Sequence, residues 1–572
     1  MTPNVQKIFA TYLKISKKEQ SRITTPQLNV LYNIYRRTER DPEYAAELKK
    51  FDTGLGDDIA SLINKFFDAY NTRFGLDIRD SLIEFDDPEF TEGAYFMITT
   101  YKILEDGTLE EKCPLEFEAC DKVHVKAVLY SHATDKPMKA VKLAMSLAND
   151  NGETDSLEIS DADTMEFDIT LNRPGAVKFN IVALGADGKG LVGAESAAGG
   201  AIFGREKILP YHAVPADFDE FWDEQIRRLM TVDPKNTASD NYEGAVLSEF
   251  DMPKKNFFSI RKFDEEFLDS FAKNGYAPQD KSKLETHTSY ELYLKAPGPC
   301  HSSGFLSIPK GAKKHSLPIT LTFDGYSAYA PMPVYSDSEI RMHSTHHGYE
   351  MAMPREGYYL KLSRGGILAN YGRGTSDPNA GYDDIRDCYM TYLHLRNMQM
   401  LRYVTDPALS GDIENLHEYW NGEVKLIGGS MGGYQAGFTA ALATILKKHS
   451  APFKITYVGA SVPAFCNGAG QLDNRIKTGL PVYTEGSDYY DLALAAHLIE
   501  CPIEVQRAAL GDESCPATRI TAFFNSIPET TVKKIKYLQN SSHGYIPDEY
   551  AQHWIIYRYN IPEGEDITGM VF

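Results

Sequence analysis

The sequence predicts an α/β protein with two further regions before the α/β part, and three patterns carry this prediction. From about residue 280 onward, strand-like and helix-like runs alternate, which is typical of a mostly parallel sheet. Between about 91 and 198, polar and apolar residues alternate with a period of two, which is typical of antiparallel strands. Residues 1–90 instead repeat apolar positions at helical spacing. We therefore expect three domains, over 1–90, 91–205 and 206–572.

The helical prediction for 1–90 rests on helix starts and on one amphipathic face. Thr25-Pro26 and Asp41-Pro42-Glu43 each place a capping residue before a proline, as at the first turn of a helix. An apolar face follows at helical spacing, made of Ile59, Leu62, Ile63, Phe66 and Phe67. These residues carry no chemistry, so we expect a packing or oligomerisation element.

The strands expected in 91–205 are short and separated by turn signals, which predicts an immunoglobulin-like β-sandwich. Asn151-Gly152, Pro174-Gly175 and Asp187-Gly188 are the turn signals, and Ala197-Ala198-Gly199-Gly200 has the composition of a linker. Such a module can bind carbohydrate, or it can shape a neighbouring site or an interface. The alternating apolar positions are Leu115, Phe117 and Ala119, then Val123, Val125 and Ala127, then Met165, Phe167 and Ile169, and finally Val177, Phe179 and Ile181.

The run Gly428-Gly429-Ser430-Met431-Gly432-Gly433 indicates a catalytic serine in the third domain. A short apolar strand, Val424 to Ile427, precedes it, and an alanine-rich run with helical spacing, Tyr434 to Leu446, follows it. A strand, Gly-x-Ser-x-Gly and a helix together form the nucleophile elbow of α/β-hydrolases. The alternative is an ordinary glycine-rich turn between a strand and a helix. We expect residues 206–572 to form an α/β-hydrolase catalytic domain with Ser430 as its nucleophile.

A serine hydroxyl needs a histidine base and a carboxylate that orients it, and in this fold they follow the serine as acid and then histidine. Asp512 lies in the loop after the strand predicted at Pro502 to Gln506, and His543 follows the strand predicted at Val532 to Leu538. These placements favour Asp512 as the acid and His543 as the base. The alternatives are Asp488 or Glu513 for the acid and, in a run with helical spacing, His553 for the base.

The oxyanion hole of this fold uses two backbone N–H groups. The first belongs to the residue after the serine, which is Met431. The second comes from the loop after an earlier strand. Pro318 to Phe323 reads as that strand and Asp324-Gly325-Tyr326 as its loop, so the amide of Tyr326 is the candidate. The alternative is that this loop is a simple turn.

Two further patterns could hold ligands, but neither has the context that a binding site requires. His343-Ser344-Thr345-His346-His347 has histidines at chelating spacing without a carboxylate or cysteine set beside them. We therefore expect a polar loop there, with no metal. Arg364-Gly365-Gly366 and Gly372-Arg373-Gly374 lack the strand and helix that surround a phosphate-binding loop. No cofactor is expected.

Composition describes an acidic globular protein. Of 572 residues, 42% are hydrophobic and 24% charged, and the net charge of -21 argues against nucleic acid and anionic membrane surfaces as partners. The seven cysteines lack paired spacing, which favours free thiols. The first residues lack the apolar core of a signal peptide, so we expect a cytoplasmic protein unless a presequence has been removed.

Roughly residues 290–560 resemble the acetyl xylan esterase and cephalosporin C deacetylase family of carbohydrate esterases. The family motif Gly-Gly-Ser-Gln-Gly-Gly is matched by Gly428 to Gly433, with Met431 in the glutamine position. The Asp-x-x-Cys-Pro segment that carries the family's acid is matched by Asp512 to Pro516. The family's His-Gly-Tyr-Gly loop is similar to Asp324 to Ser327, and Val462 to Cys466 is similar to a further stretch. The Arg-Gly-Gln motif has no clear copy, and Gly544 replaces the usual glutamate after the histidine.

The resemblance implies a serine esterase that removes acetyl groups from O-acetylated carbohydrates, such as xylo-oligosaccharides, and needs no cofactor. The family includes oligomers, so a homo-oligomer is one expectation, although residues 1–205 are an addition to the family's compact form. A general carboxylesterase or a serine peptidase on the same fold stays open, since fold does not fix substrate. A non-catalytic carbohydrate-binding or structural protein with a degenerate hydrolase domain is the other alternative.

Overall fold

The structure is a computed structural model that describes most of the chain from residue 94 onward. It describes residues 94–131, 136–237, 258–298, 301–326, 332–345, 384–476 and 483–544, with the backbone of strand β18 (Gln552–Arg558) and six isolated positions before residue 94. The helical region predicted over 1–90 lies outside the described residues apart from those positions. Its fold therefore stays a prediction.

The chain forms two compact units, and the division is not collinear with the sequence. The first, here called the strand unit, comprises Met1–Arg205 together with Ala509–Asp512 and Leu538–Trp554. The second, here called the α/β unit, comprises Glu206–Ala508, Glu513–Tyr537 and Ile555–Phe572. Two short late segments thus belong with the N-terminal strands. The three-domain division expected from the sequence stays a prediction.

The strand unit contains two four-stranded antiparallel sheets, with strand orders β2-β1-β3-β6 and β5-β4-β7-β8. The period of two in the sequence produces these strands, because alternate side chains of a strand point to opposite faces. The strands of the first sheet are β1 (Ala94–Ile103), β2 (Leu109–Glu111), β3 (Lys122–Ser131) and β6 (Thr164–Thr170). Those of the second are β4 (Ala140–Asn149), β5 (Thr154–Ala162), β7 (Gly175–Leu184) and β8 (Ala197–Phe203).

One hydrophobic core joins both sheets of the strand unit. It combines the inward positions predicted on β3, β6 and β7 with residues of β1, β4 and β8, such as Phe96, Leu143 and Phe203. The run Leu115 to Ala119 forms only an isolated bridge, Phe117 to Phe203, so the prediction of a strand there was wrong. Antiparallel strands are confirmed, whereas the immunoglobulin-like arrangement is not confirmed.

Residues Ala197 to Gly200, predicted to be a linker, are instead the first half of strand β8. All seven residues of β8 are buried, and β8 pairs with β7 from Gly175↔Phe203 to Ile181↔Ala197. Small residues are typical of linkers, but here they are required by close packing. A Cβ on Gly199 would lie 2.6 Å from the ring of Phe179, and one on Gly200 would lie 2.7 Å from the carbonyl oxygens of Leu510 and Val177.

The third sheet has ten strands, some parallel and some antiparallel, in the order β18-β17-β16-β15-β14-β12-β13-β11-β10-β9. The neighbours β13-β12, β12-β14, β14-β15 and β15-β16 are parallel, whereas the pairs formed by β9, β10, β11 and β13 at the other end are antiparallel. The expected parallel sheet is therefore the central part of a mixed one. Its strands are β9 (Ser259–Lys262), β10 (His287–Leu294), β11 (Ser302–Pro309), β12 (Leu317–Phe323), β13 (Ile340–Ser344), β14 (Trp420–Gly429), β15 (Lys454–Ser461), β16 (Ile503–Ala509), β17 (Lys533–Gln539) and β18.

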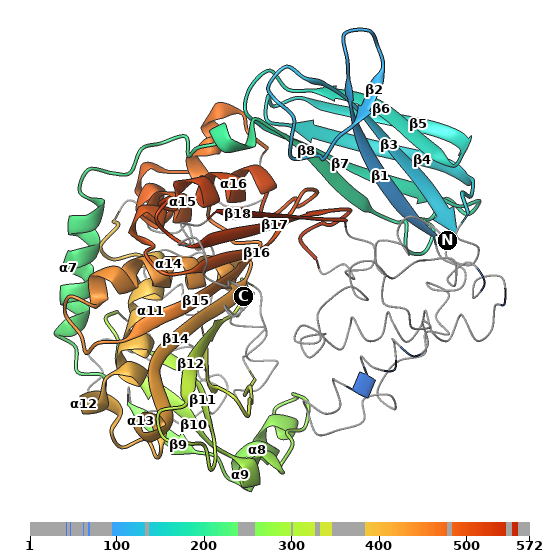
Figure 1. Ribbon diagram of the computed structural model, residues 1–572. Coiled ribbons are helices and arrows are strands. Elements are labelled where there is room, and N and C mark those ends of the chain that lie inside the picture. The colour runs from blue at the N-terminus through green and yellow to red at the C-terminus, as the bar shows by residue number, and fades with distance from the viewer. Residues whose placement is uncertain are drawn as a thin grey trace. The chain divides into compact units, whose positions relative to one another are not determined.

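Helix α14 (Met431–Leu446) packs against β14 and β15 and is covered by α11 (Tyr389–Thr405) and α7 (Phe218–Met230), as Figure 1 shows. Helix α14 is apolar on every side and almost wholly buried, as expected of a helix enclosed by a sheet and two other helices. Trp222 of α7 lies 5.4 Å from Phe438 of α14, between ring centroids, and fixes that contact. The remaining α-helices are α8 (Glu265–Lys273), α9 (Lys283–Thr286), α12 (Pro407–Ser410), α13 (Leu416–Tyr419), α15 (Leu492–Ala495) and α16 (Ala517–Ser526).

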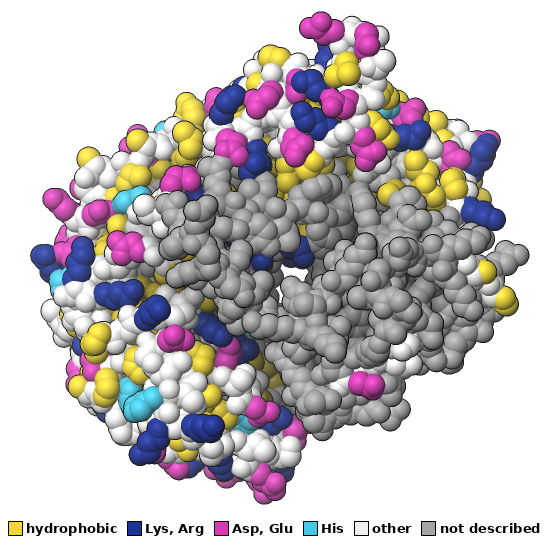
Figure 2. All heavy atoms as spheres, viewed as in Figure 1, with side chains coloured by type: hydrophobic (Ala, Val, Ile, Leu, Met, Phe, Trp, Pro, Cys, Tyr) yellow, Lys and Arg dark blue, Asp and Glu magenta, His cyan; other side chains and the backbone are white. Residues whose placement is uncertain are grey.

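On the face drawn in Figure 2, acidic and basic side chains are interspersed over the described residues. One surface ion pair of the strand unit joins Lys142 of β4 to Glu158 of β5, with Nζ 3.1 Å from the carboxylate. None of the described helices is long and apolar enough to span a membrane. The six cysteines in the described part of the chain are free thiols.

Candidate active site

Ser430 occupies a strained turn between strand β14 and helix α14. Its backbone has φ 57° and ψ −121°, and residues other than glycine rarely adopt a positive φ. Backbone hydrogen bonds hold the turn: the Ser430 N–H donates to the Ser461 carbonyl (2.9 Å), and the Ser430 carbonyl accepts from Tyr434 and Ala464 (3.0 and 3.1 Å). Strain that surrounding contacts maintain in this way is found most often at functional sites.

Three glycines around Ser430 are required by close backbone contacts: Gly428, Gly432 and Gly433. A Cβ on Gly428 would lie 2.4 Å from the backbone of Gly432, and one on Gly432 would lie 2.2 Å from the Phe323 carbonyl oxygen. A Cβ on Gly433 would lie 2.7 Å from the Ser461 carbonyl oxygen. The helix can therefore start directly beside strands β12 and β15 only because these positions lack side chains. The predicted strand, tight turn and helix are all present.

The loop predicted to complete an oxyanion hole lies beside the serine. Strand β12 runs parallel to β14 with Phe323 opposite Gly428, so Asp324-Gly325-Tyr326 leaves the sheet next to Gly429 and Ser430. A Cβ on Gly325 would lie 3.6 Å from the Gly429 carbonyl oxygen and 3.9 Å from Cβ of Ser430. Met431 is the first residue of α14, where helix geometry leaves N–H groups without an intrahelical acceptor.

His343, predicted to lie in a polar loop, is instead on strand β13 and braces the loop beside the serine. Its Nε2 lies 2.7 Å from Oδ1 of Asp324, and its Nδ1 lies 2.9 Å from the Met332 carbonyl oxygen. A carbonyl can only accept, so both ring nitrogens carry protons when both contacts are made. Burial lowers the pKa of His343, but the hydrogen bond and charge of Asp324 outweigh it and raise this pKa above its usual value. Gln435 adds a hydrogen bond to the Asp324 carbonyl (3.0 Å).

Asp512 and His543 are brought together in the strand unit. Asp512 follows strand β16 and is fully buried, and His543 follows strand β17 with its side chain about one-quarter exposed. Nδ1 of His543 lies 2.9 Å from Oδ2 of Asp512. A histidine whose Nδ1 donates to a buried carboxylate has a fixed ring orientation and presents a basic Nε2.

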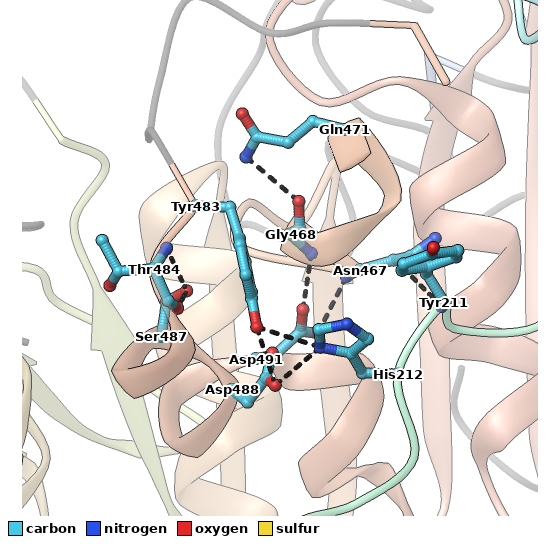
Figure 3. A network of polar contacts seen from close by, with 10 residues as sticks. All are labelled: Tyr211, His212, Asn467, Gly468, Gln471, Tyr483, Thr484, Ser487, Asp488 and Asp491. Carbon is cyan, nitrogen blue, oxygen red and sulfur yellow. Dashed lines mark hydrogen bonds and ion pairs between the residues drawn. The ribbon is translucent and has the colours of Figure 1, made fainter. Parts of the chain in front are cut away.

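Asp488, one alternative acid, belongs to a different network in the α/β unit, shown in Figure 3. Its Oδ2 lies 2.8 Å from Nδ1 of His212 and accepts from the Tyr483 hydroxyl at 3.0 Å. Beside it, buried Asp491 accepts from the backbone N–H groups of Asn467 and Gly468. Asp488 is thus already paired with another histidine, a contact that its sequence context does not reveal.

The other two alternatives lie in different settings. Glu513 is exposed and follows Asp512 directly, whereas Asp512 is the carboxylate beside His543. His553 was predicted to lie in a helical run, which was wrong: it lies in strand β18. It directly precedes the continuous apolar run Trp554 to Tyr557, and periodicity alone does not assign such a short run to a helix or to a strand.

Of the possible ligand patterns noted in the sequence, the structure describes only the first part, His343 to Thr345. His343 is engaged by Asp324 and Met332, while His346, His347, Arg364 to Gly366 and Gly372 to Gly374 lie outside the described residues. Asp512 and His543 offer a carboxylate and an imidazole, and buried Cys515 follows Asp512 by three residues along the chain. These are zinc-ligand types, but Nδ1 of His543 is already directed at the carboxylate.

Comparison with solved structures finds acetyl xylan esterases. Acetyl xylan esterase 1 from Thermoanaerobacterium sp. JW/SL YS485 matches with a TM-score of 0.40 and 18% identity, covering 60% of this chain and 93% of that one. Acetyl xylan esterase from Paenibacillus sp. R4 matches with a TM-score of 0.41 and 16% identity, covering 60% and 94%. No protein-family model matches the sequence. No curated protein matches it either.

Proposed function

We propose that this protein is an α/β-hydrolase-type serine esterase that removes acetyl groups from O-acetylated carbohydrates through an acyl-enzyme intermediate. Ser430 is the nucleophile, His543 the general base and Asp512 the carboxylate that orients it. The backbone N–H groups of Met431 and Tyr326 are the oxyanion donors. The substrate is an acetylated oligosaccharide of the xylo-oligosaccharide type, and this chemistry needs no cofactor.

The reaction begins when Nε2 of His543 takes the hydroxyl proton as Oγ of Ser430 bonds to the ester carbonyl carbon. The resulting oxyanion accepts hydrogen bonds from the Met431 and Tyr326 amides. The bond from the carbonyl carbon to the sugar oxygen then breaks, and the proton on Nε2 passes to the leaving sugar alcohol. Water, deprotonated by His543, attacks the acyl-enzyme and releases acetate, while the proton returns to Ser430. Asp512 stabilises the imidazolium in both halves of the reaction.

The observation that carries the proposal is the backbone of Ser430. A positive φ at a strand-to-helix junction, with Gly428 and Gly432 too crowded for a Cβ, is the geometry that lifts a nucleophilic hydroxyl off the end of a sheet. A plain glycine-rich turn has no need of a strained serine at its apex. The Asp512–His543 hydrogen bond gives independent support, since these two residues were selected from chain order and from their placement after predicted strands.

The substrate class rests on the sequence resemblance rather than on the geometry. Gly428 to Gly433 and Asp512 to Pro516 are the two stretches that match the carbohydrate esterases. Both stretches surround the reacting groups, so they support the chemistry more directly than the sugar. The sugar preference is therefore the part of the proposal that the experiment must separate from the serine chemistry.

The decisive experiment measures acetate release from acetylated xylo-oligosaccharides and from an aryl acetate, using the wild type and Ser430→Ala. We expect both substrates to be cleaved by the wild type, and kcat to fall by about 10³-fold or more in Ser430→Ala. Ser270→Ala, a serine of helix α8, is the matched control and should retain full activity.

Each other outcome selects a named alternative. Cleavage of the aryl acetate without release of acetate from the sugar would leave a general carboxylesterase. Hydrolysis of peptide amides in place of esters would indicate a serine peptidase. A protein that cleaves none of these and does not react with a fluorophosphonate probe would be a non-catalytic binding or structural protein.

A further inference from the structure

Strand β8 forms the outer edge of its sheet, and that edge is bonded to the segment before His543 and packed against the segment that carries Asp512. In the order β5-β4-β7-β8, β8 is terminal, so its backbone groups at alternate residues face away from β7. Unpaired edge groups seek hydrogen-bond partners. Here the hydrogen-bond partners are Gln539 and Ser541 for the first half of the strand and the Pro114 carbonyl for Ile202. Residues 510–512, which belong to the same compact unit, pack against this edge.

Gln539 binds β8 in the way that a neighbouring strand would. Its Oε1 accepts from the Gly200 N–H at 2.8 Å, and its Nε2 donates to the Gly200 carbonyl at 2.9 Å. One side-chain amide thus satisfies both backbone groups of one residue. The side chain is buried, and a Cβ on Gly199 would lie 2.8 Å from its Oε1, so the two glycines make room for it.

Both loops of the acid–base couple are held against Ala198. The Ser541 N–H donates to the Ala198 carbonyl (2.8 Å), and the Gly511 N–H donates to the Ser541 carbonyl (3.1 Å). A Cβ on Gly511 would lie 2.4 Å from Cβ of Ala198, so the loop before Asp512 lies directly on β8. A further bond joins Nδ2 of Asn540 to the Phe96 carbonyl of β1 (3.3 Å).

The anchored residues are next to the reacting ones. Gly511 directly precedes Asp512, and Ser541 lies two residues before His543. Asp512 is fully buried, so its carboxylate takes its position from its backbone and from packing rather than from solvent. Because a displacement of about 1 Å at catalytic groups can cost about 10²-fold in rate, the rigidity of this anchor bears directly on catalysis.

We propose that strand β8 sets the position of the Asp512–His543 couple, with Gln539, Gly200 and Gly511 as positioning residues. Residues 94–205 then act in catalysis through these contacts, beyond any role in binding carbohydrate. This inference rests on the proposed function for its catalytic meaning, but the positioning itself is measurable without turnover.

The test uses the full chain with Gln539→Leu and Gly200→Ala. Leucine keeps the bulk of Gln539 and removes both hydrogen bonds, while alanine at position 200 drives a Cβ against the Leu510 carbonyl, at 2.7 Å. The direct readout is the deshielded proton resonance of His543 Nδ1, assigned by its loss in His543→Gln. The second readout is the pH profile of kcat for an aryl acetate.

Gly175→Ala is the matched control. Its Cβ would lie 2.7 Å from Oδ2 of Asp150, a similar crowding in the same unit. Gly175 pairs with Phe203 of β8, so the substitution strains the β7–β8 pair away from residues 510–512 and 538–541. We expect it to lower the melting temperature about as much as Gly200→Ala, and to leave the His543 resonance and kcat unchanged.

We expect Gln539→Leu and Gly200→Ala to shift or broaden the resonance and to lower kcat by roughly 10-fold or more, with KM little changed. They should also move the acid limb of the pH profile, which reports the base. Should either variant not fold, Gln539→Glu, which keeps one acceptor, takes its place with an intermediate effect. Unchanged resonance and kcat in the folded variants, or equal losses in Gly175→Ala, would overturn the inference. Failure of the proposed function would appear differently, as a wild type with the resonance but no Ser430-dependent turnover.

Discussion

The serine side and the acid–base side of the candidate site are held in different ways. Ser430 lies in the α/β unit, in a turn bonded to residues of its own sheet such as Ser461 and crowded by Phe323. Asp512 and His543 lie in the strand unit, on loops anchored to β8 more than 300 residues earlier in the chain. Glycine pattern and backbone strain define the first side, whereas long-range hydrogen bonds define the second. One side is therefore encoded locally and the other only by the whole fold.

The largest effect is expected from Asp512→Asn, which breaks the acid–base side alone. Asparagine keeps the shape but permits the wrong histidine tautomer, and kcat should fall by about 10⁴-fold, as for this change in other catalytic triads. The measurement is kcat for an aryl acetate. Asp488→Asn, at the carboxylate paired with His212, should keep activity near that of the wild type. Similar losses in both variants would contradict the assignment of Asp512.

Gly432→Ala breaks the serine side alone and should lower kcat by about 10²-fold. Its Cβ would lie 2.2 Å from the Phe323 carbonyl oxygen, so α14 and Ser430 must shift. Gly429→Ala is the comparison within the same turn, since its Cβ would approach nothing closer than 3.9 Å. In both variants, kcat is measured with an aryl acetate, and the reactivity of Ser430 is measured separately as the rate of labelling by a fluorophosphonate. A labelling rate in Gly432→Ala that equals that of Gly429→Ala would show that the tight turn is not needed for reactivity.

His343→Gln sharpens the comparison because it loosens the oxyanion loop and leaves both the turn and the acid–base couple intact. We expect a loss of roughly 10-fold in kcat, since one oxyanion donor is misplaced without being removed. The stability effect depends on pH. The pKa of His343 is raised on folding, so its contribution is fully present below its unfolded pKa, near 6.5, and is lost as pH rises through the folded pKa.

Thermal unfolding of His343→Gln and the wild type at several pH values checks this sign. The difference between them should be largest in acid and should shrink at alkaline pH. His497→Gln is the matched control, since His497 also faces a carbonyl (Leu494, 2.7 Å) and a carboxylate (Asp219, 2.9 Å), but at an exposed site where solvent screens the pair. A difference between His343→Gln and the wild type that grows with pH would contradict the charged state assigned to His343.

The smallest effect on activity is expected from Asp491→Asn, which lies in the network of Figure 3 and touches neither side. Burial raises the pKa of Asp491 to about 6, against the lowering effect of three backbone N–H donors. The folded state therefore takes up a proton at higher pH than the unfolded state does. Stability should decrease as pH rises from about 4 to about 6, by on the order of 2–3 kcal/mol. Chemical denaturation across this range should show that slope in the wild type and a flatter one in Asp491→Asn.

Local patterns predicted the serine side well. Strand, glycines and helix around Ser430 occur within about 30 residues, and each carries its own signal in the sequence: an apolar run, the Gly-x-Ser-x-Gly pattern and helical spacing. The strands β3, β6 and β7 were likewise predicted from a period of two. Chain order then placed Asp512 and His543 after the correct strands. The strands and the turn were predictable because each needed only neighbouring residues, whereas the contact between Asp512 and His543 needed the fold.

Long-range contacts account for what the sequence did not predict. Ala197 to Gly200 has the composition of a linker, and only the approach of Gln539 and Leu510 reveals why small residues are needed there. His343 was considered as a metal ligand in a loop because its partner Asp324 is 19 residues away and belongs to another strand end. Asp488 competed for the acid role until its contact with His212, 276 residues away, was known. No local pattern contains such pairs.

The bond between Gly200 and Gln539 also determines when the protein becomes complete during synthesis. The two residues are 339 positions apart, so at 5–20 residues per second Gln539 is made roughly 20–70 s after Gly200. During this interval the Ala198–Gly200 edge of β8 lacks its native partners while the rest of the strand unit is already available to fold. Such an edge is a template for pairing with another nascent chain. The contact proposed to position Asp512 and His543 thus leaves an interval in translation during which this edge is open to pairing with other chains.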